Sequence, residues 1–345
     1  AKGYLPTLRQ STGVVEISDF DKDGDMDIFI GSRIIPGMYP ETPTSYLLLN
    51  DGHGKFEDAT SAIAPTLASV GMVTIAKWVD IDNDGWQDLI VGGEFMPLTV
   101  YINNKGKGLI DRTRTYFSEP LPGLWSAIDV ADYDNDGDMD FVVGNFGLNS
   151  QLKASADQPL SLTYADFDKN GSIDPIVTYY NNGKEYPFAS RDEITNQIFA
   201  LRKKFPTYES YSEAQLEDIF TKKELEEAKK LTANTLESYY IENRSGQFKV
   251  APLPTEAQFS PVNAIYSYDF NKDGNMDFVL AGNQSFIRIR LGVIDANYGQ
   301  LFLGDGHGSF NMVPQKNCGL NLKGDVKSIQ QINIGVFPYL TFGIN

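Results

Sequence analysis

The chain has 345 residues, with 46 acidic and 29 basic side chains, a formal net charge of −17, 41% hydrophobic residues and a single cysteine. This composition is typical of a folded protein, and the length suits either two average domains or one large all-β domain. The negative charge argues against nucleic-acid binding, and one cysteine supports neither a disulfide framework nor a cysteine zinc site. No apolar run reaches the roughly 18–20 residues that cross a bilayer, and the first residues do not form a signal peptide, so we expect a mature or excised soluble region.

A nine-residue acidic pattern occurs five times along the chain. We number the copies loop 1 (19–27), loop 2 (80–88), loop 3 (132–140), loop 4 (166–174) and loop 5 (269–277). Aspartate occupies positions 1, 3, 5 and 9 and glycine position 6, except that Asn170 and Asn271 replace one aspartate in each of the last two loops. Apolar, partly alternating segments flank every copy, which predicts a strand, an acidic loop and a second strand.

A second repeated element predicts hairpins. It is clearest at 46–56 and 300–310, where Asp-Gly-His-Gly separates two apolar runs, and weaker at 100–110 and 239–248. Two strands around an acidic loop plus a hairpin make a four-stranded antiparallel unit, and such units in radial order form a β-propeller. We therefore predict an all-β propeller in a single domain, 1–345, with six blades favoured and seven as the alternative.

The spacing of the loops predicts irregular units. Intervals of 61, 52, 34 and 103 residues between first aspartates predict a trimmed third unit and an insertion in the fourth. Residues 191–236 change to a period of 3.6, with candidate capping boxes at Ser190, Ser212 and Thr221, so we expect this insertion to be helical. Residues 324–345 predict a sixth unit without an acidic loop.

The acidic loops are candidate calcium sites. They resemble the start of an EF-hand, but position 12 is Ile30, Val91, Val143, Val177 or Leu280 where an EF-hand has its bidentate glutamate, and no helical pattern flanks them. Hard oxygen ligands on a loop suit calcium, with a backbone carbonyl at position 7. We predict about five Ca²⁺ sites, with candidate ligands Asp19, Asp21, Asp23, Asp25, Asp27, Asp80, Asp82, Asp84, Trp86, Asp88, Asp132, Asp134, Asp136, Asp138, Asp140, Asp166, Asp168, Asn170, Ser172, Asp174, Asp269, Asn271, Asp273, Asn275 and Asp277.

Electrostatic repulsion explains why such loops need a cation. Four carboxylates about 5 Å apart form six repulsive pairs of about 3 kcal/mol each at an effective dielectric near 20, an upper bound of roughly 20 kcal/mol in total. This exceeds a typical domain stability of about 5–15 kcal/mol. Because Asn170 and Asn271 each remove one charge, we expect weaker binding in loops 4 and 5.

The repeated loops, each followed by an apolar strand and a glycine, resemble the FG-GAP or VCBS repeat family and look like the calcium loops in the propeller of integrin α-subunits. The resemblance covers the chain outside the helical insertion and implies a six- or seven-bladed propeller with calcium between the first two strands of several blades. Segments 31–37, 144–149 and 187–193 also look like large bacterial secreted VCBS-repeat proteins of the cell-envelope type. That group implies no activity that can be carried over.

A catalytic set is missing from the sequence. His53 and His307, which are the only histidines, both lie in Asp-Gly-His-Gly turns, where a turn role is expected. The chain has no Gly-x-Ser-x-Gly elbow, phosphate loop or His-Glu-x-x-His motif.

We expect a binding face at the ends of the units opposite the acidic loops. The connections there carry amides, charges and aromatics, including Tyr39, Phe95, Phe146 and Phe286. The candidate ligand-binding residues are Arg33, Glu94, Asn145, Asn149, Arg191, Asn283 and Gln284. We expect these side chains to converge around the axis, while Trp78 and Trp125 pack between units.

Three functions remain open. The leading hypothesis is a non-enzymatic, calcium-stabilised module at a bacterial cell surface or in the secreted fraction, which binds a protein or glycan. The second is a calcium-dependent polysaccharide lyase that uses Arg191, Arg33 or Glu94. The third is a structural or assembly part of a larger envelope protein.

Overall fold

The strand–loop–strand units of the sequence form antiparallel sheets in the computed structural model, which describes residues 4–285 and 291–345. Sheet 1 consists of β1 (Ser11–Ser18), β2 (Asp27–Ile34), β3 (Tyr46–Asn50) and β4 (Phe56–Asp58) in that order. Sheet 2 consists of β5 (Met72–Val79), β6 (Asp88–Asn103) and β7 (Leu109–Asp111), and β8 (Pro122–Leu124) pairs with the middle of β6.

Three further sheets continue the series. Sheet 3 consists of β9 (Ala127–Ala131), β10 (Asp140–Gly144), β15 (Tyr239–Asn243) and β16 (Phe248–Pro252). Sheet 4 consists of β17 (Val262–Tyr268), β18 (Asp277–Gly282), β19 (Gln300–Gly304) and β20 (Phe310–Met312). Sheet 5 is the hairpin of β21 (Val326–Ile334) and β22 (Phe337–Ile344), which matches the expected last unit without an acidic loop.

The third unit is complete rather than trimmed, which corrects our expectation. The hairpin at 239–252 pairs with β10 of the third unit and not with the fourth, so sheet 3 is interrupted by a long excursion of the chain. The backbone N–H of Asn145 donates to Ser238 Oγ at 3.0 Å, so the chain returns to the point where it left the sheet. Spacing alone could not reveal this, because it does not say which hairpin closes which sheet.

The excursion carries its own sheet, which we call the inserted sheet. It consists of β11 (Leu160–Ala165), β12 (Asp174–Asn181), β13 (Lys184–Pro187) and β14 (Lys229–Ala233), in the order β13-β12-β11-β14. Loop 4 therefore joins two strands of the inserted sheet and not the first strands of a fourth unit in the series.

The helical insertion ends earlier than predicted. Its helices are α3 (Arg191–Gln197), α4 (Leu201–Lys204), α5 (Tyr208–Tyr211), α6 (Leu216–Ile219) and α7 (Lys222–Glu227). Residues 229–233 form β14 because Leu231 pairs with Leu162 of β11, and this strand pairing outweighs the local helical spacing. The capping boxes at Ser190 and Thr221 are present, whereas the one expected at Ser212 is replaced by a box from Gln215 to Asp218.

The remaining helices are short connections between strands. They are α1 (Thr60–Ile63), α2 (Thr113–Tyr116), α8 (Gln315–Cys318), η1 (Leu67–Ser69) and η2 (Thr255–Gln258).

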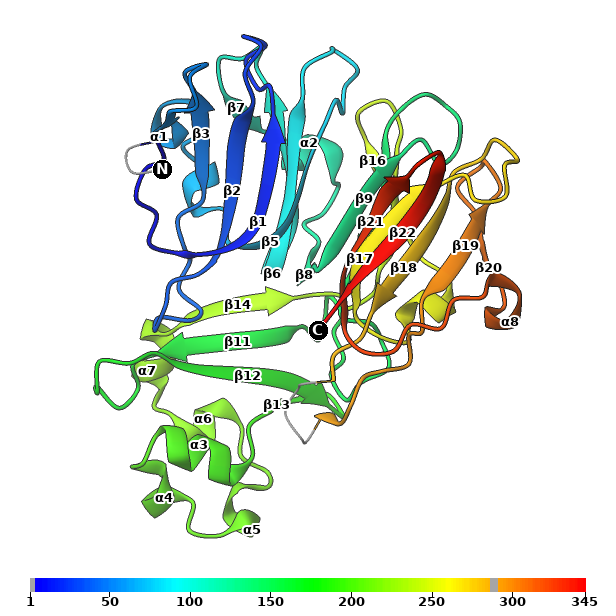
Figure 1. Cartoon of the computed structure of the whole chain (residues 1–345). Helices are drawn as coiled ribbons and strands as arrows, with labels where there is room; N and C mark the ends of the chain where they lie inside the picture. Colours follow the sequence, from blue (N-terminus) through cyan, green and yellow to red (C-terminus); the bar gives the residue numbers. More distant parts are fainter. Residues whose placement is uncertain (1–3, 286–290) are drawn as a thin grey trace.

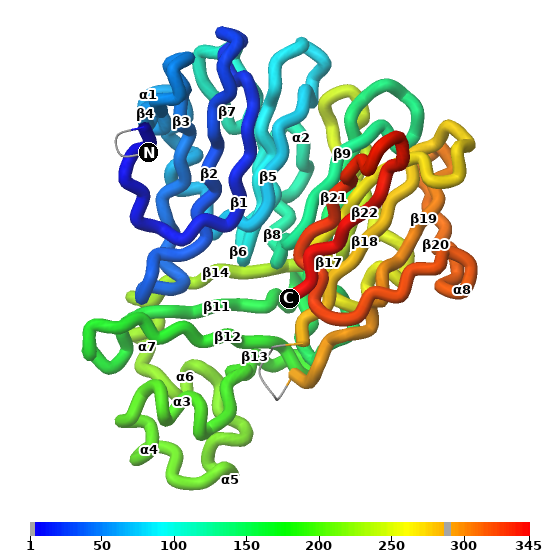
Figure 2. The backbone as a smooth tube through the Cα atoms, viewed as in Figure 1, coloured from blue at the N-terminus to red at the C-terminus, as the bar shows by residue number. Residues whose placement is uncertain are grey.

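The five sheets stand in a series, and their first strands β1, β5, β9, β17 and β21 are successive neighbours (Figure 1). Each gap between neighbouring sheets is filled by buried apolar side chains, such as Phe29 and Val73 between sheets 1 and 2, or Val142 and Phe278 between sheets 3 and 4. The inserted sheet lies across the lower ends of this series, as the tube in Figure 2 makes clear. The radial closure and the number of blades stay predictions.

The aromatic cluster between sheets 3 and 4 predicts a large stability effect. Phe278 is fully buried, stacks on Phe302 at 5.0 Å and touches Tyr133 and Phe310. We expect Phe278→Ala to lower the free energy of unfolding by about 3–5 kcal/mol, because truncation leaves a cavity. Phe199→Ala is the control: Phe199 is 69% exposed, and we expect a change within about 0.5 kcal/mol. Urea unfolding measures both, and a loss below about 1 kcal/mol for Phe278→Ala would contradict the packing described.

Candidate functional site

The five acidic loops share one backbone conformation. Each joins two antiparallel strands, and position 4 adopts the left-handed region in every copy, with φ of 59° at Lys22, 58° at Asn83 and 61° at Asn135. Position 6 needs glycine because φ there is far into the positive range, for example 97° at Gly24. Position 9 is the first residue of the following strand, so the loop ends where the strand pairing begins.

Hydrogen bonds to the backbone orient the carboxylates. In loop 2, Asp80 accepts from the N–H of Gly85 at 2.8 Å, Asp82 from Asp84 at 3.2 Å, and Asp84 from Trp86 at 2.9 Å. These bonds use one oxygen of each carboxylate. The second oxygen stays available for a ligand.

Carboxylate oxygens converge in four of the loops. One carboxylate oxygen from each of three residues lies within 4.8 Å of the others, and the groups are Asp19, Asp21 and Asp27; Asp80, Asp82 and Asp88; Asp132, Asp134 and Asp136; and Asp166, Asp168 and Asp174. Among the described residues, loop 5 forms no such group of three, and Asn271 takes the place of one of its carboxylates.

Two oxygens in these groups are buried without a partner. Asp19 Oδ1 and Asp80 Oδ1 accept no hydrogen bond, although a buried carboxylate oxygen normally does. A divalent cation would satisfy them and relieve the repulsion, and an all-oxygen donor set suits a hard ion. The Asp clusters could therefore hold metal ions, with the carboxylates as ligands.

The aspartate at position 9 ties each loop to its sheet. Asp88 is fully buried and accepts from the N–H of Ile81 at 2.9 Å and of Asn103 at 2.7 Å. Burial raises the pKa of Asp88 to about 7 and that of Asp140 to about 6, since water no longer solvates the charged form. A bound cation would favour the ionised carboxylates.

Sequence reasoning missed the asparagines that end a strand just before a hairpin turn. Asn50, Asn103 and Asn243 occupy equivalent places, and each donates its backbone N–H to the position-9 aspartate of its own sheet. The available signal was the recurrence of Asn immediately before three of the hairpin turns.

The two histidines have the expected place in turns. The N–H groups of His53 and His307 each donate to the side chain of the aspartate two residues earlier at 2.9 Å.

A cavity of about 600 Å³ lies where sheets 1, 2, 4 and 5 meet the inserted sheet. Six of the residues expected at the binding face line it: Arg33, Tyr39, Glu94, Phe95, Phe146 and Gln284. Arg33 Nε donates to Glu94 Oε1 at 2.9 Å, which forms an ion pair in its wall, and Lys327 adds a second cation. Trp125 also borders the cavity, although it is 1% exposed and packs between sheets as predicted.

Three of the expected binding residues form hydrogen bonds to backbone carbonyls of this chain instead. Asn145 and Asn283 are buried, and their amides bond the carbonyls of Thr235 and of Asn297, respectively. Asn149 donates to the Phe259 carbonyl at 3.3 Å and is absent from the cavity lining. Phe286 lies outside the described residues.

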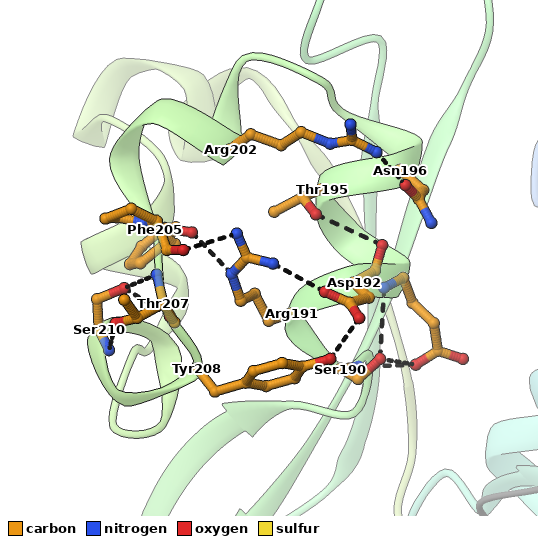
Figure 3. A network of polar contacts seen from close by, with 12 residues as sticks. Ser190, Arg191, Asp192, Thr195, Asn196, Arg202, Phe205, Thr207, Tyr208 and Ser210 are labelled. Atoms are coloured by element: carbon orange, nitrogen blue, oxygen red, sulfur yellow. Dashed lines mark hydrogen bonds and ion pairs between the residues drawn. The ribbon is translucent and has the colours of Figure 1, made fainter.

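Arg191 does not join the other residues at the cavity. Figure 3 shows it inside the helical insertion, where it donates to the carbonyls of Phe205 at 2.8 Å and Pro206 at 3.1 Å and to Asp192 at 2.8 Å. Tyr208 also bonds Asp192, and Arg191 lines a separate cavity of about 570 Å³. The expectation failed because the excursion from sheet 3 carries this segment away from the meeting point of the sheets.

Comparison with known proteins identifies the repeats. The FG-GAP-like repeat family matches residues 19–91 and 80–143, so the chain contains FG-GAP-like repeats, as the acidic loops indicated. Similar solved structures include a lectin of Agrocybe aegerita that recognises non-reducing terminal N-acetylglucosamine. It is 15% identical to this chain, with a TM-score of 0.31, and the match covers 94% of this chain and 72% of the lectin chain. The V. cholerae biofilm matrix protein Bap1 is 9% identical, with a TM-score of 0.29 and coverage of 93% and 64%. These TM-scores support no inference about ligands.

The helices give no sign of a bilayer crossing. Within 4–285 and 291–345, every helix is too short or too polar to span a membrane.

Metal binding predicts a calcium-dependent stability. With ligand at about 50 times the dissociation constant, one site adds about 2 kcal/mol, so 5 mM calcium should raise the melting temperature well above that in chelator. Asp80→Asn together with Asp82→Asn should remove part of this gain, because both contribute to the loop 2 cluster. Asp157→Asn, at an exposed position outside the loops, is the control. Equal melting curves with calcium and with chelator would contradict the metal assignment.

The raised pKa values predict how the metal-free protein responds to pH. Asp88 has a pKa of about 7 when folded and about 3.9 when unfolded, so the folded state binds more protons between these values. Its contribution to stability therefore falls as pH rises from about 4 to 7. In chelator, we expect Asp88→Asn to flatten the decline in the free energy of unfolding between pH 5 and pH 8. Urea unfolding at both pH values checks this, and parallel pH profiles for the two proteins would argue against a raised pKa.

Proposed function

We propose that this chain is a calcium-stabilised β-propeller module that binds a protein or glycan through its axial cavity and has no catalytic activity. We further propose that it acts at the cell surface or in the secreted fraction, as a six- or seven-bladed propeller. Calcium sites built on such loops suit the higher calcium concentrations outside cells.

The cavity is the observation that carries the binding proposal. Its volume of about 600 Å³ falls in the range of small-ligand sites, and aromatic rings there lie beside the Arg33–Glu94 pair. Sugars and peptides are both recognised by aromatic faces combined with a few polar groups. Arg33 lies on β2, and Glu94 and Phe95 lie on β6, and this placement on strands supports a preformed site.

The lyase alternative has weaker support. Arg191 already donates to three protein groups in the helical insertion, and Arg33 and Glu94 pair with each other. Neither arrangement supplies a free base beside a free cation, which general acid–base chemistry would need.

A glycan and peptide array tests the binding proposal. The full chain in 5 mM calcium should bind a defined subset of spots, and Tyr39→Ala and Glu94→Ala should each weaken that binding at least tenfold, because both side chains line the cavity. Lys222→Ala, 90% exposed on α7, is the matched control and should bind like the unmodified chain.

Two results would contradict the proposal. One is array binding that the cavity variants leave unchanged, which would place the site elsewhere. The other is release of unsaturated products from acidic polysaccharides, abolished by Arg33→Ala, which would support the lyase.

A further inference from the structure

Neighbouring metal loops are joined by buried amides. Asn103 ends β6 in sheet 2; its backbone N–H holds Asp88 of loop 2, and its side-chain amide donates to the Phe20 carbonyl of loop 1 at 2.9 Å. Asn243 in sheet 3 repeats this arrangement, with its N–H on Asp140 of loop 3 and its amide on the Ile81 carbonyl of loop 2 at 2.9 Å. Both asparagines are almost completely buried, so they lose these bonds only if the loops move.

A second set of contacts joins the loops at the surface. In each case the position-4 side chain of one loop reaches the position-7 residue of the next. Asn83 of loop 2 donates to Asp138 of loop 3 at 2.7 Å, and Asn135 of loop 3 donates to Asn275 of loop 5 at 2.9 Å. Lys22 of loop 1 lies over the Trp86 ring of loop 2 at 4.5 Å.

The residues that make these contacts lie next to the candidate metal ligands in the sequence. Phe20 and Ile81 occupy position 2, between the ligands at positions 1 and 3, and position 7 is where we expect the backbone carbonyl ligand. A cation that fixes one loop therefore also fixes the acceptor that the next sheet's asparagine needs. Ordering one loop lowers the entropy cost of ordering its neighbour, which is positive coupling.

Loop 4 offers an internal comparison. It has the same converging carboxylates, Asp166, Asp168 and Asp174, but belongs to the inserted sheet. Among the hydrogen bonds, ion pairs and ring contacts found for the described residues, none joins loop 4 to another acidic loop. Its position-4 residue, Lys169, acts electrostatically on Glu224 of the helical insertion instead.

We propose that loops 1, 2, 3 and 5 bind cations as one coupled series, in which filling one loop strengthens binding in the next, whereas loop 4 binds independently. This inference rests on the calcium binding in the proposed function and goes beyond it by assigning Asn103, Asn243, Asn83 and Asn135 as the links.

Terbium luminescence on the full chain can read loop 2 by itself. Trp86 occupies position 7 of loop 2, so excitation of tryptophan sensitises a Tb³⁺ ion bound there. Asp80→Asn with Asp82→Asn identifies the part of the signal that belongs to loop 2. Loop 1 is then disabled with Asp19→Asn and Asp21→Asn, loop 3 with Asp132→Asn and Asp134→Asn, and loop 4 with Asp166→Asn and Asp168→Asn.

We expect disabling loop 1 or loop 3 to raise the Tb³⁺ midpoint of loop 2 about fivefold, the lower end of typical coupling between sites. Disabling loop 4 should leave the midpoint unchanged. Asn103→Ala should weaken the effect of loop 1, because the contact of Lys22 with the Trp86 ring remains. Asn50→Ala is its matched control, because Asn50 bonds Asp27 and Met26 within its own unit. Asn83→Gly, which keeps the left-handed backbone of position 4 and removes the side chain that bonds Asp138, should weaken the effect of loop 3.

The outcomes separate the proposed coupling between loops from the proposed calcium binding on which it rests. If Tb³⁺ binds loop 2 with the same midpoint whichever loop is disabled, the coupling is overturned and the metal assignment stands. If the unmodified chain gives no signal from loop 2, the proposed calcium binding is overturned together with the coupling. An equal shift after disabling loop 4 would overturn the assignment of the links.

Discussion

Repulsion among clustered aspartates is the constraint around which this molecule is organised. Three carboxylate oxygens meet within 4.8 Å in each of four loops, and two of them, on Asp19 and Asp80, are buried without a hydrogen-bond partner. Such a cluster is costly unless a cation or protons neutralise it. The backbone bonds that hold the carboxylates in place therefore keep these oxygens close together although their charges repel.

The same aspartates also shape the sheets. Position 9 receives N–H groups from its own loop and from the residue before the hairpin turn, so one side chain connects the loop to the hairpin. Asn103 and Asn243 extend these contacts to the neighbouring sheet. The acidic loops are thus part of the packing between sheets, whereas the cavity of about 600 Å³ lies where these sheets meet the inserted sheet.

The local pattern of the sequence was sufficient for the loops and strands but not for their long-range pairing. The Asp and Gly spacing identified the five loops because each needs left-handed backbone at fixed positions. The hairpin at 239–252 was assigned to the wrong unit, since strand pairing across an excursion leaves no trace in periodicity. The same excursion explains why Arg191 was expected at the cavity, and why Leu231, at helical spacing, lies in a strand. The linking role of Asn103 was also invisible, because its partner Phe20 is remote in sequence.

The interruption of sheet 3 has a consequence for how the chain folds during synthesis. β10 ends at Gly144, but its partner β15 begins only at Tyr239, so the ribosome must produce the entire excursion before the third sheet can close. Until then β10 presents an open edge beside finished sheets, a hazard for aggregation. The inserted sheet and its helices have a core of their own around Ile176 and Ile194, so this segment can collapse by itself while the edge waits. Nascent-chain release before Pro252 would therefore yield an aggregation-prone species, and late closure of sheet 3 would be the slow, non-local step of folding.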